Sequence, residues 1–331
     1  MRFNKLDLNL LVALDALLSE RSISRAAERV HLSQSAMSNA LARLREYFDD
    51  ELLVQVGRKM EPTPRAEGLA DAVRDVLVRV EATISTQPAF VPAESTREFR
   101  LLVSDYTLTT LMPHVLARVY AQAPNIRIDL RPQVAHPERA LERADADLLI
   151  IPRDYCSTDH PSETLLDEQF CCVLWEGATL AHATLTREAY LEAGHIVVLP
   201  GQGQPALEDW FVKRLGVSRR VEVTTFSFAA AAQLVVGTQR IATVHRRLAL
   251  LAQRHEPIAI HDVPLHMPAM HQAVQWHRHR SADEGLSWLR GILREAVEAM
   301  DRAVGGPGQR VEDSVAPPRK ARRAKARSKM D

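Results

Sequence analysis

Four polar residues at the start of one short segment carry the clearest chemical signal in this chain. Gln34, Ser35, Ser38 and Asn39 have small hydroxyl or amide side chains that donate and accept hydrogen bonds. They begin a predicted helix over residues 34–47. Helical spacing places the four on one face of it, because its apolar residues recur on the opposite face. Such a face at a helix N-terminus suits base edges in the major groove of DNA. The alternative is an ordinary helical hairpin whose polar face meets solvent.

Cationic and hydroxyl side chains flank these four residues. Arg43 lies one helical turn further on, Ser33 lies at the helix start, and Arg58 and Lys59 follow in the segment VGRKM. Such groups bind DNA phosphates, which positions a protein without reading sequence. We therefore predict that Ser33, Arg43, Arg58 and Lys59 contact the sugar-phosphate backbone of the DNA. A solvated charged turn is the alternative for Arg58 and Lys59.

A second group of polar and aromatic residues follows predicted strands further along the chain. Hydroxyl groups there, together with amides at helix starts, can hold a carboxylate. Arg153 or His245 would add a charge-assisted contact, while Tyr106 and Phe226 would flank a ring. The predicted ligand-binding residues are Ser104, Asp105, Tyr106, Thr107, Arg153, Gly203, Gln204, Phe226, Ser227 and His245.

Histidine and cysteine offer two further chemistries. Residues 255–279 hold six histidines, and His277 and His279 would share one strand face, as two metal ligands do. No cysteine or carboxylate stands at metal-ligand spacing, so we interpret them as surface or strand histidines and predict no metal. Cys156 would be a redox sensor if Arg153 stabilised its thiolate. No resolving cysteine is near, which favours an inert thiol.

Catalytic motifs are missing from the sequence. It contains no nucleophile elbow, phosphate-binding loop or zinc-protease motif. We therefore predict no catalytic residues, no cofactor and no enzymatic activity.

Two short helices joined by a tight turn would position the first group. Ser22 is the expected N-cap of a helix over residues 24–30, in which Ala26 and Ala27 allow a second helix to approach closely. The second helix spans residues 34–47, and a helix over residues 6–20 supplies the floor. The segment LLVQVGRKMEPTP then predicts a two-stranded wing. The buried face of the second helix is expected to hold Ala36, Ala40, Leu41, Leu44 and Phe48.

A longer helix is predicted over residues 65–86, followed by a hinge. Its apolar residues recur at spacings of three or four, as Leu69, Val73, Val76, Val80 and Ile84. We expect nothing in its own domain to bury this seam, so a second copy of the chain is the predicted partner.

The rest of the chain alternates short apolar runs with helical segments, which is typical of parallel, doubly wound α/β units. Two such units follow one another, and ligands of these units bind at the carboxyl ends of the strands. The predicted divisions are 1–64 for the helix pair and wing, 65–87 for the long helix, 88–97 for the hinge, 98–302 for the two α/β lobes and 303–331 for a disordered basic tail.

Composition and charge limit the partners and the cellular compartment that we expect for the protein. With 42 basic and 42 acidic residues in 331, the seven basic residues of 317–330 leave the remainder at a net charge of −7. This imbalance argues against indiscriminate coating of nucleic acid and for defined contact surfaces. Three cysteines make no disulfide framework, and we find no signal peptide or membrane-length apolar run. We predict a cytoplasmic protein that does not contact membranes.

Residues 6–68 resemble the N-terminal domain of the LysR-type transcriptional regulators, especially in AAERVHLSQSAMSNALARLREYFDDELLVQVGRKMEPTPRAEGL. One departure is Ser35, where many relatives have proline, and serine also fits a first helical turn. The two lobes resemble the effector-binding domain of that family, which is itself similar to periplasmic solute-binding proteins. The segments VSDYTLTTLMP and VEVTTFSFAAAAQLVVGTQRIATVHRRLA look nearest to regulators of nodulation genes and of naphthalene or salicylate degradation.

This resemblance implies an N-terminal winged helix-turn-helix with a linker helix, and a two-lobed α/β effector domain. It implies an activator that binds double-stranded promoter DNA, pairs with itself through the linker helix, assembles into a tetramer and changes the access of RNA polymerase. The implied effector is a small aromatic or phenolic molecule, often an acid. The alternative hypothesis is a two-lobed solute receptor that does not read DNA.

Overall fold

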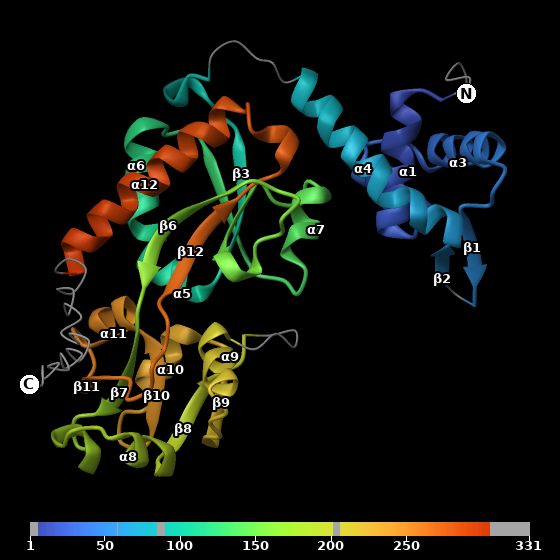
Figure 1. Cartoon of the computed structure of the whole chain (residues 1–331). Helices are drawn as coiled ribbons and strands as arrows, with labels where there is room; N and C mark the ends of the chain where they lie inside the picture. The colour runs from blue at the N-terminus through green and yellow to red at the C-terminus, as the bar shows by residue number, and fades with distance from the viewer. Residues whose placement is uncertain (1–5, 58, 85–89, 201–205, 305–331) are drawn as a thin grey trace, which may run out of the picture.

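The computed structural model describes residues 6–57, 59–84, 90–200 and 206–304. Its N-terminal part is a three-helix unit with a wing (Figure 1). The helices are α1 (Leu8–Glu20), α2 (Ile23–Arg29) and α3 (Gln34–Phe48), and the wing is the antiparallel pair β1 (Leu53–Val56) and β2 (Lys59–Pro62). Gly57 in the wing turn has φ +64°, a left-handed conformation that favours glycine. The predicted winged helix-turn-helix is confirmed.

Side-chain caps and small residues build this unit. Ser22 and Ser33 cap α2 and α3, each accepting a hydrogen bond from the backbone N–H three residues later. Ala26 and Ala27 are buried where α2 crosses its neighbours, as predicted. The buried face of α3 is Met37, Leu41 and Leu44, whereas Ala40 and Phe48 pack only at its edge. The prediction placed Ala36 on the buried face and missed its neighbour Met37, whereas Ala36 is only half-buried.

The apolar seam of the linker helix α4 (Pro64–Ile84) is partly covered by its own domain, so the prediction that nothing there buries it is wrong. Leu69, Val73 and Leu77 pack into the N-terminal core, so much of the seam is buried within the same chain. Arg74 binds α4 to α1, since its Nε lies 2.7 Å from Asp15 Oδ1. Val76, by contrast, remains 43% exposed. The side chain of Ile84 lies outside the described part of the chain.

Lobe I of the effector domain is a five-stranded sheet in the order β4-β3-β5-β12-β6. Strands β3, β4 and β5 run parallel, whereas β12 is antiparallel to β5 and β6, so the sheet is mixed and not purely parallel. Helix α12 packs with α6 over this lobe (Figure 1). Its elements are η2 (Pro92–Glu94), β3 (Glu98–Val103), α5 (Asp105–Thr110), α6 (Met112–Gln122), β4 (Arg127–Pro132), α7 (Pro137–Glu142), β5 (Leu148–Pro152), η3 (Arg153–Tyr155), β6 (Ser162–Glu168), β12 (Met270–Gln275), η5 (Arg278–Arg280) and α12 (Glu284–Val304).

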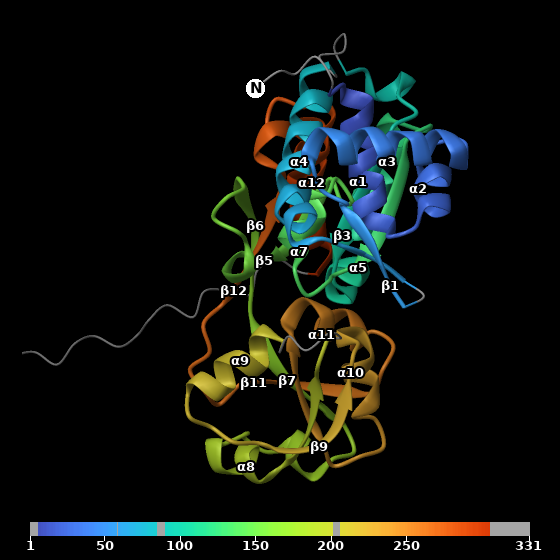
Figure 2. The same ribbon diagram turned by 90° about the vertical axis from the view of Figure 1, so that its right-hand side faces the viewer.

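Lobe II is a second mixed sheet, in the order β11-β7-β10-β8-β9. Strand β7 is antiparallel to β10 and β11, which again departs from the predicted parallel sheet. The chain crosses between the lobes twice, from β6 to β7 and from β11 to β12, and the lobes lie end to end (Figure 2). Its elements are β7 (Phe170–Trp175), η4 (Thr179–His182), α8 (Arg187–Glu192), β8 (Gly194–Val198), α9 (Leu207–Arg214), β9 (Arg220–Thr225), α10 (Phe228–Leu234), β10 (Ile241–His245), α11 (Arg246–Ala252) and β11 (Ile258–Asp262).

Three elements differ from the sequence prediction. The helix expected over 108–122 is two helices that break at Leu111, because Pro113 has no N–H to continue the ladder. Strand β6 was missed because this edge strand, SETLLDE, is polar. Helix α8 was missed because six residues are too few for a clear periodicity. The predicted tail from 305 onward lies outside the described residues, as do residues 88 and 89 of the predicted hinge, whereas residues 90–97 of the hinge are described and include η2.

The linker helix also contacts lobe I, where it packs on α7 and η5. Arg278 Nη2 lies 3.0 Å from Asp75 Oδ1 across this contact. Within the described ranges, we find no helix of the length and apolarity needed to cross a membrane.

Candidate functional site

The outer face of α3 carries the predicted DNA-contacting residues. Gln34, Ser35, Ser38 and Asn39 are all exposed. Ser33 caps the helix, and its Oγ lies 3.0 Å from that of Ser35. The structure thus brings these residues together on one polar surface at the helix N-terminus.

The cations around this surface have different roles. Arg43 is exposed and its Nη2 lies 3.4 Å from Asp7 Oδ2. Lys59 is exposed at the start of β2, and Arg58 lies outside the described residues. Arg45 instead donates to the carbonyl oxygens of residues 51 and 53, so it holds the start of the wing.

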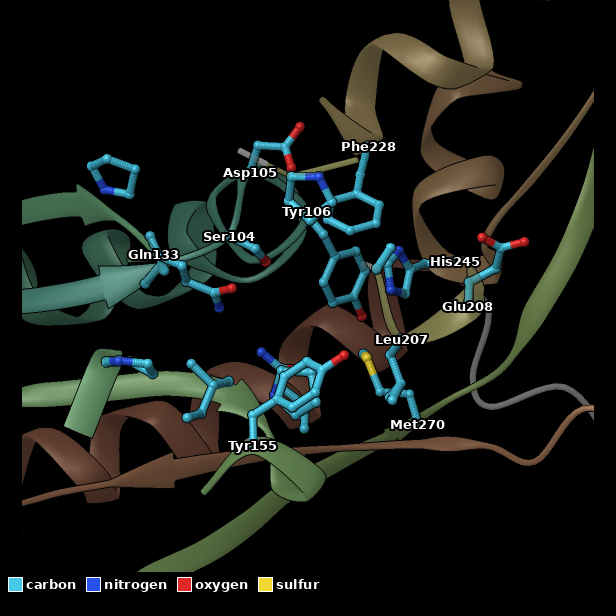
Figure 3. A pocket seen from close by; sticks show the side chains of 18 of the residues that line it. Ser104, Asp105, Tyr106, Gln133, Tyr155, Leu207, Glu208, Phe228, His245 and Met270 are labelled. Atoms are coloured by element: carbon cyan, nitrogen blue, oxygen red, sulfur yellow. The ribbon is translucent and has the colours of Figure 1, made fainter. Parts of the chain in front are cut away.

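A cavity of about 570 Å³ lies between the two lobes of the effector domain (Figure 3). Of the predicted ligand-binding residues, six line it: Ser104, Asp105, Tyr106, Phe226, Ser227 and His245. Thr107 lies just behind the lining and accepts a hydrogen bond from Gln272. Arg153 lies outside the cavity and donates to Thr164, while Gly203 and Gln204 lie outside the described residues.

One wall of the cavity is an aromatic stack. The ring centroids of Tyr106 and His245 are 4.1 Å apart with an interplanar angle of 24°, and Phe228 meets His245 edge-on at 4.9 Å. Tyr155 lies across the cavity from Tyr106 (Figure 3). The hydroxyl of Tyr106 donates to Glu168. The ring of Tyr106 therefore faces the cavity while its polar atom is satisfied behind it.

The two lobes also touch beside the cavity through Asp105. Its Oδ2 accepts from Ser227 Oγ at 2.6 Å and from the N–H of Ala229 at 3.1 Å. Asp105 lies in lobe I, whereas both donors lie at the start of α10 in lobe II. The carboxylate is thus already satisfied by the opposite lobe.

Several lining residues were missed by sequence reasoning. Met270 and Gln272 belong to β12, and Leu207 and Glu208 begin α9. The prediction considered only the carboxyl ends of parallel strands, whereas β12 runs antiparallel and contributes its interior. A glutamine inside the apolar run of MHQAVQ was the signal that pointed to Gln272.

Two buried polar atoms of the lining have no hydrogen-bond partner in the described structure. These atoms are Oε1 of Gln272 and Nδ1 of His245, whose residues are 1% and 4% exposed. Buried polar groups are normally paired, so unpaired ones beside a cavity indicate a missing ligand or water. The described lining contains no lysine or arginine.

Burial holds several histidines of the effector domain neutral, among them His245, His195 and His277, the last with its pKa lowered to about 4. Burial lowers the pKa of His245, which lies among the rings of Tyr106, Phe170 and Phe228, to about 3. Burial likewise lowers the pKa of His195 to about 4, although Nε2 contacts the carbonyl oxygen of Tyr190 at 2.7 Å.

We expect the protein to lose stability as the pH falls from about 6.5 toward 4. The unfolded chain binds protons at these histidines that the folded chain does not, which is worth up to about 1.4 kcal/mol per pH unit for each ring. Urea unfolding at a series of pH values measures this loss. His195→Asn should reduce the slope, whereas His136→Asn, at an exposed site, should not. Burial raises the pKa of Glu208 to about 7, so the folded chain binds this proton more readily than the unfolded chain does. Glu208 therefore adds stability as the pH falls, and it does so equally in every variant. An unchanged slope in His195→Asn would contradict this account.

The remaining histidines and cysteines form no reactive centre in the described residues. His277 and His279 lie in or beside the turn η5 and not on a strand, and His277 is buried against His160. No group of three or more candidate ligands in the described ranges is arranged to hold a metal. Burial raises the pKa of the Cys156 thiol, which opposes the thiolate that a redox sensor requires.

Comparison with protein-family models gives two matches. Residues 8–67 match the bacterial regulatory helix-turn-helix protein of the lysR family, and residues 92–298 match the LysR substrate binding domain. The chain belongs to the LysR family of transcriptional regulators. This LysR-type regulator therefore combines a DNA-binding domain with an effector-binding domain. The alternative of a solute receptor without a DNA-reading role is wrong.

Individual relatives support the subgroup resemblance. The regulator is 40% identical over 304 residues to Nodulation protein D 1 of Bradyrhizobium sp. (strain NC92), covering 92% of this chain and 97% of that protein. It is 41% identical over 301 residues to Nodulation protein D 2 of Rhizobium leguminosarum bv. phaseoli, covering 91% and 95%.

Solved structures show the same fold. A probable transcriptional regulator from Pseudomonas aeruginosa has a TM-score of 0.61 at 29% identity, covering 88% of this chain and 98% of that one. A full-length OxyR variant from Pseudomonas aeruginosa has a TM-score of 0.69 at 17% identity, covering 88% and 95%.

Proposed function

We propose that this LysR-type regulator reads its operator with Gln34, Ser35, Ser38 and Asn39. Their exposure on α3 supports this role, because each side chain is free to enter a major groove. Ser33, Arg43, Arg58 and Lys59 would bind the DNA backbone. Ser33, Arg43 and Lys59 are exposed in the same domain, and Arg58 precedes Lys59 in the sequence. Arg45 is not part of this set, because its guanidinium is engaged by the wing.

The regulator would act as an oligomer, with α4 as the pairing element. Val76 is exposed on α4, one turn beyond the buried Val73, and Val80 is half-buried. Two paired chains would present two copies of α3 to two half-sites of one operator. An effector that favours one arrangement of the subunits would then change the DNA bend and the access of RNA polymerase, and activate transcription.

The effector would be a neutral phenolic molecule, and the two unpaired atoms of the cavity carry this proposal. Gln272 Oε1 can only accept a hydrogen bond, so it requires a donor such as a phenolic hydroxyl. The Tyr106–His245 stack suits an aromatic ring. An acid, which the sequence suggested, would meet the carboxylates of Asp105 and Glu208, and the described part of the lining offers no lysine or arginine to balance its charge. We therefore favour the phenol over the acid.

We expect 2-naphthol to bind more tightly than 2-naphthoate, which has the same ring system with a carboxylate in place of the hydroxyl. Titration calorimetry on the full-length protein measures both affinities. Gln272→Leu should weaken 2-naphthol binding by about 5- to 10-fold, because it removes a hydrogen bond of roughly 1 to 1.5 kcal/mol. Gln233→Leu is the matched control, since that glutamine is exposed on lobe II outside the lining. Tighter binding of the acid would refute the proposed effector class.

A further inference from the structure

A chain of four side chains runs from the cavity wall to the outer helix α12. The Tyr106 hydroxyl donates to Glu168, and Arg247 Nη1 lies 3.1 Å from the same carboxylate oxygen. The Nε and Nη2 atoms of Arg247 lie 2.9 and 2.8 Å from Asp301 Oδ1. Glu168 is 1% exposed, so its charge depends on Arg247 for compensation.

These residues come from both lobes and from the crossing between them. Tyr106 lies on α5 of lobe I, and Arg247 lies on α11 of lobe II. Glu168 ends β6 at the first crossing, and Asp301 lies on α12, which packs over lobe I (Figure 1). The network therefore spans the joint about which the lobes would turn.

The crossing itself is bound to the start of α11. Glu168 Oε1 accepts from the N–H of Gln169 at 3.0 Å and from that of Arg247 at 3.3 Å. The N–H of Arg246 in turn donates to the carbonyl oxygen of Gln169 at 2.8 Å. A rotation at this crossing must therefore break hydrogen bonds of a buried carboxylate.

The network is joined to the cavity wall at two points, through the Tyr106 hydroxyl and through the chain segment that carries His245. His245, which stacks on Tyr106, precedes Arg247 by two residues, and Arg247 contacts the carboxylate that holds the Tyr106 hydroxyl. A change in the angle between the lobes would separate either the ring stack or the ion pairs. Because withdrawing Arg247 leaves a buried charge uncompensated, intermediate arrangements are costly and the joint favours discrete states.

We propose that Arg247 and Asp301 are positioning residues that hold the two lobes at the angle where the effector cavity is already formed. Neither residue lines the cavity, so their influence on the effector is indirect. The apparent dissociation constant of a ligand rises as the fraction of competent protein falls. Weakening the Arg247–Asp301 pair should therefore weaken effector binding without changing any lining residue. This inference rests on the proposed role of the cavity as the effector site.

Asp301→Asn tests the proposal, with Glu298→Gln as the matched control. Glu298 lies one turn earlier on α12, is exposed, and has no ion pair or hydrogen bond in the described structure. Spin labels at Ala117→Cys on lobe I and Thr184→Cys on lobe II, in a Cys156→Ser background, report the distance between lobes by pulsed electron paramagnetic resonance. Both sites are exposed, and Cys171 and Cys172 are buried away from the label. Labelled chains are diluted into an excess of unlabelled protein, so that distances within one chain dominate.

We expect Asp301→Asn to broaden or shift the distance distribution of the free protein and Glu298→Gln to leave it unchanged. Asp301→Asn should also weaken 2-naphthol binding by about fivefold or more. Arg247→Met with Glu168→Gln replaces the buried pair together and should broaden the distribution further; if it does not fold, Asp301→Asn decides. A wild-type distribution in Asp301→Asn would overturn the proposal. If 2-naphthol binds neither protein, the effector class fails, while the distances in free protein still decide the role of Arg247 and Asp301.

Discussion

Ser38→Ala combined with Asn39→Ala should weaken binding to the specific operator by roughly 5- to 150-fold. Each good bidentate contact between a side chain and a base contributes about 1 to 3 kcal/mol of discrimination. Both residues are exposed on α3 and cap nothing, so the fold should be unaffected. The measurement is fluorescence anisotropy with the DNA upstream of the protein's own coding region, over a salt series.

Binding to random duplex DNA should change little in the same variant, because that binding depends on phosphate contacts. Ser218→Ala with Asn125→Ala provides a control with the same chemistry at exposed sites on the effector domain. If the specific and random duplexes lose affinity equally, the two residues do not read bases.

Arg219→Ala should destabilise the effector domain by about 3 to 5 kcal/mol. The Arg219 side chain is 3% exposed and contacts both Glu208 and Asp209, which are 4% and 8% exposed. Removing one partner of a buried ion pair leaves the other charges uncompensated, and this costs more than the pair contributes when intact. Urea unfolding followed by circular dichroism measures the loss. Because Glu208 also lines the cavity, 2-naphthol binding should weaken in parallel.

The neighbouring arginine provides the control for this prediction. Arg220 is 65% exposed and pairs with Glu222 at 3.1 Å, so Arg220→Ala should change stability by no more than about 0.5 kcal/mol. Equal losses in the two variants would show that burial of the Arg219 network does not stabilise the lobe.

Local signals predicted the DNA-binding domain well. The caps Ser22 and Ser33 and the small pair Ala26 and Ala27 act between residues close in sequence, so they mark the helices and their crossing directly. The long helix shows the limit of such reasoning. The periodicity of Leu69 and Val73 predicted a buried seam, but only packing against α1 showed which partner covers it.

In the effector domain too, local signals predicted the elements but not how they pack together. Apolar runs predicted nearly all its strands, and the helix starts at Ser104 and Ser227 predicted two positions on the cavity wall. The predicted parallel direction was wrong for β7 and β12, because a buried strand has the same composition whether it runs parallel or antiparallel. This is why Gln272, on an antiparallel strand, was missed. Arg153 was placed in the site because it follows a strand, but its guanidinium donates to Thr164 outside the cavity.

The sequence by itself determined the family through its resemblance to known members. It determined the helix-turn-helix and the two α/β units through periodicity and short-range capping. Only the tertiary structure decided which polar atoms of the cavity lack a partner and how Tyr106, Glu168, Arg247 and Asp301 join the lobes. Those residues are as much as 195 positions apart, from 106 to 301, and a hydrogen bond between them depends on distances that the order of residues does not encode.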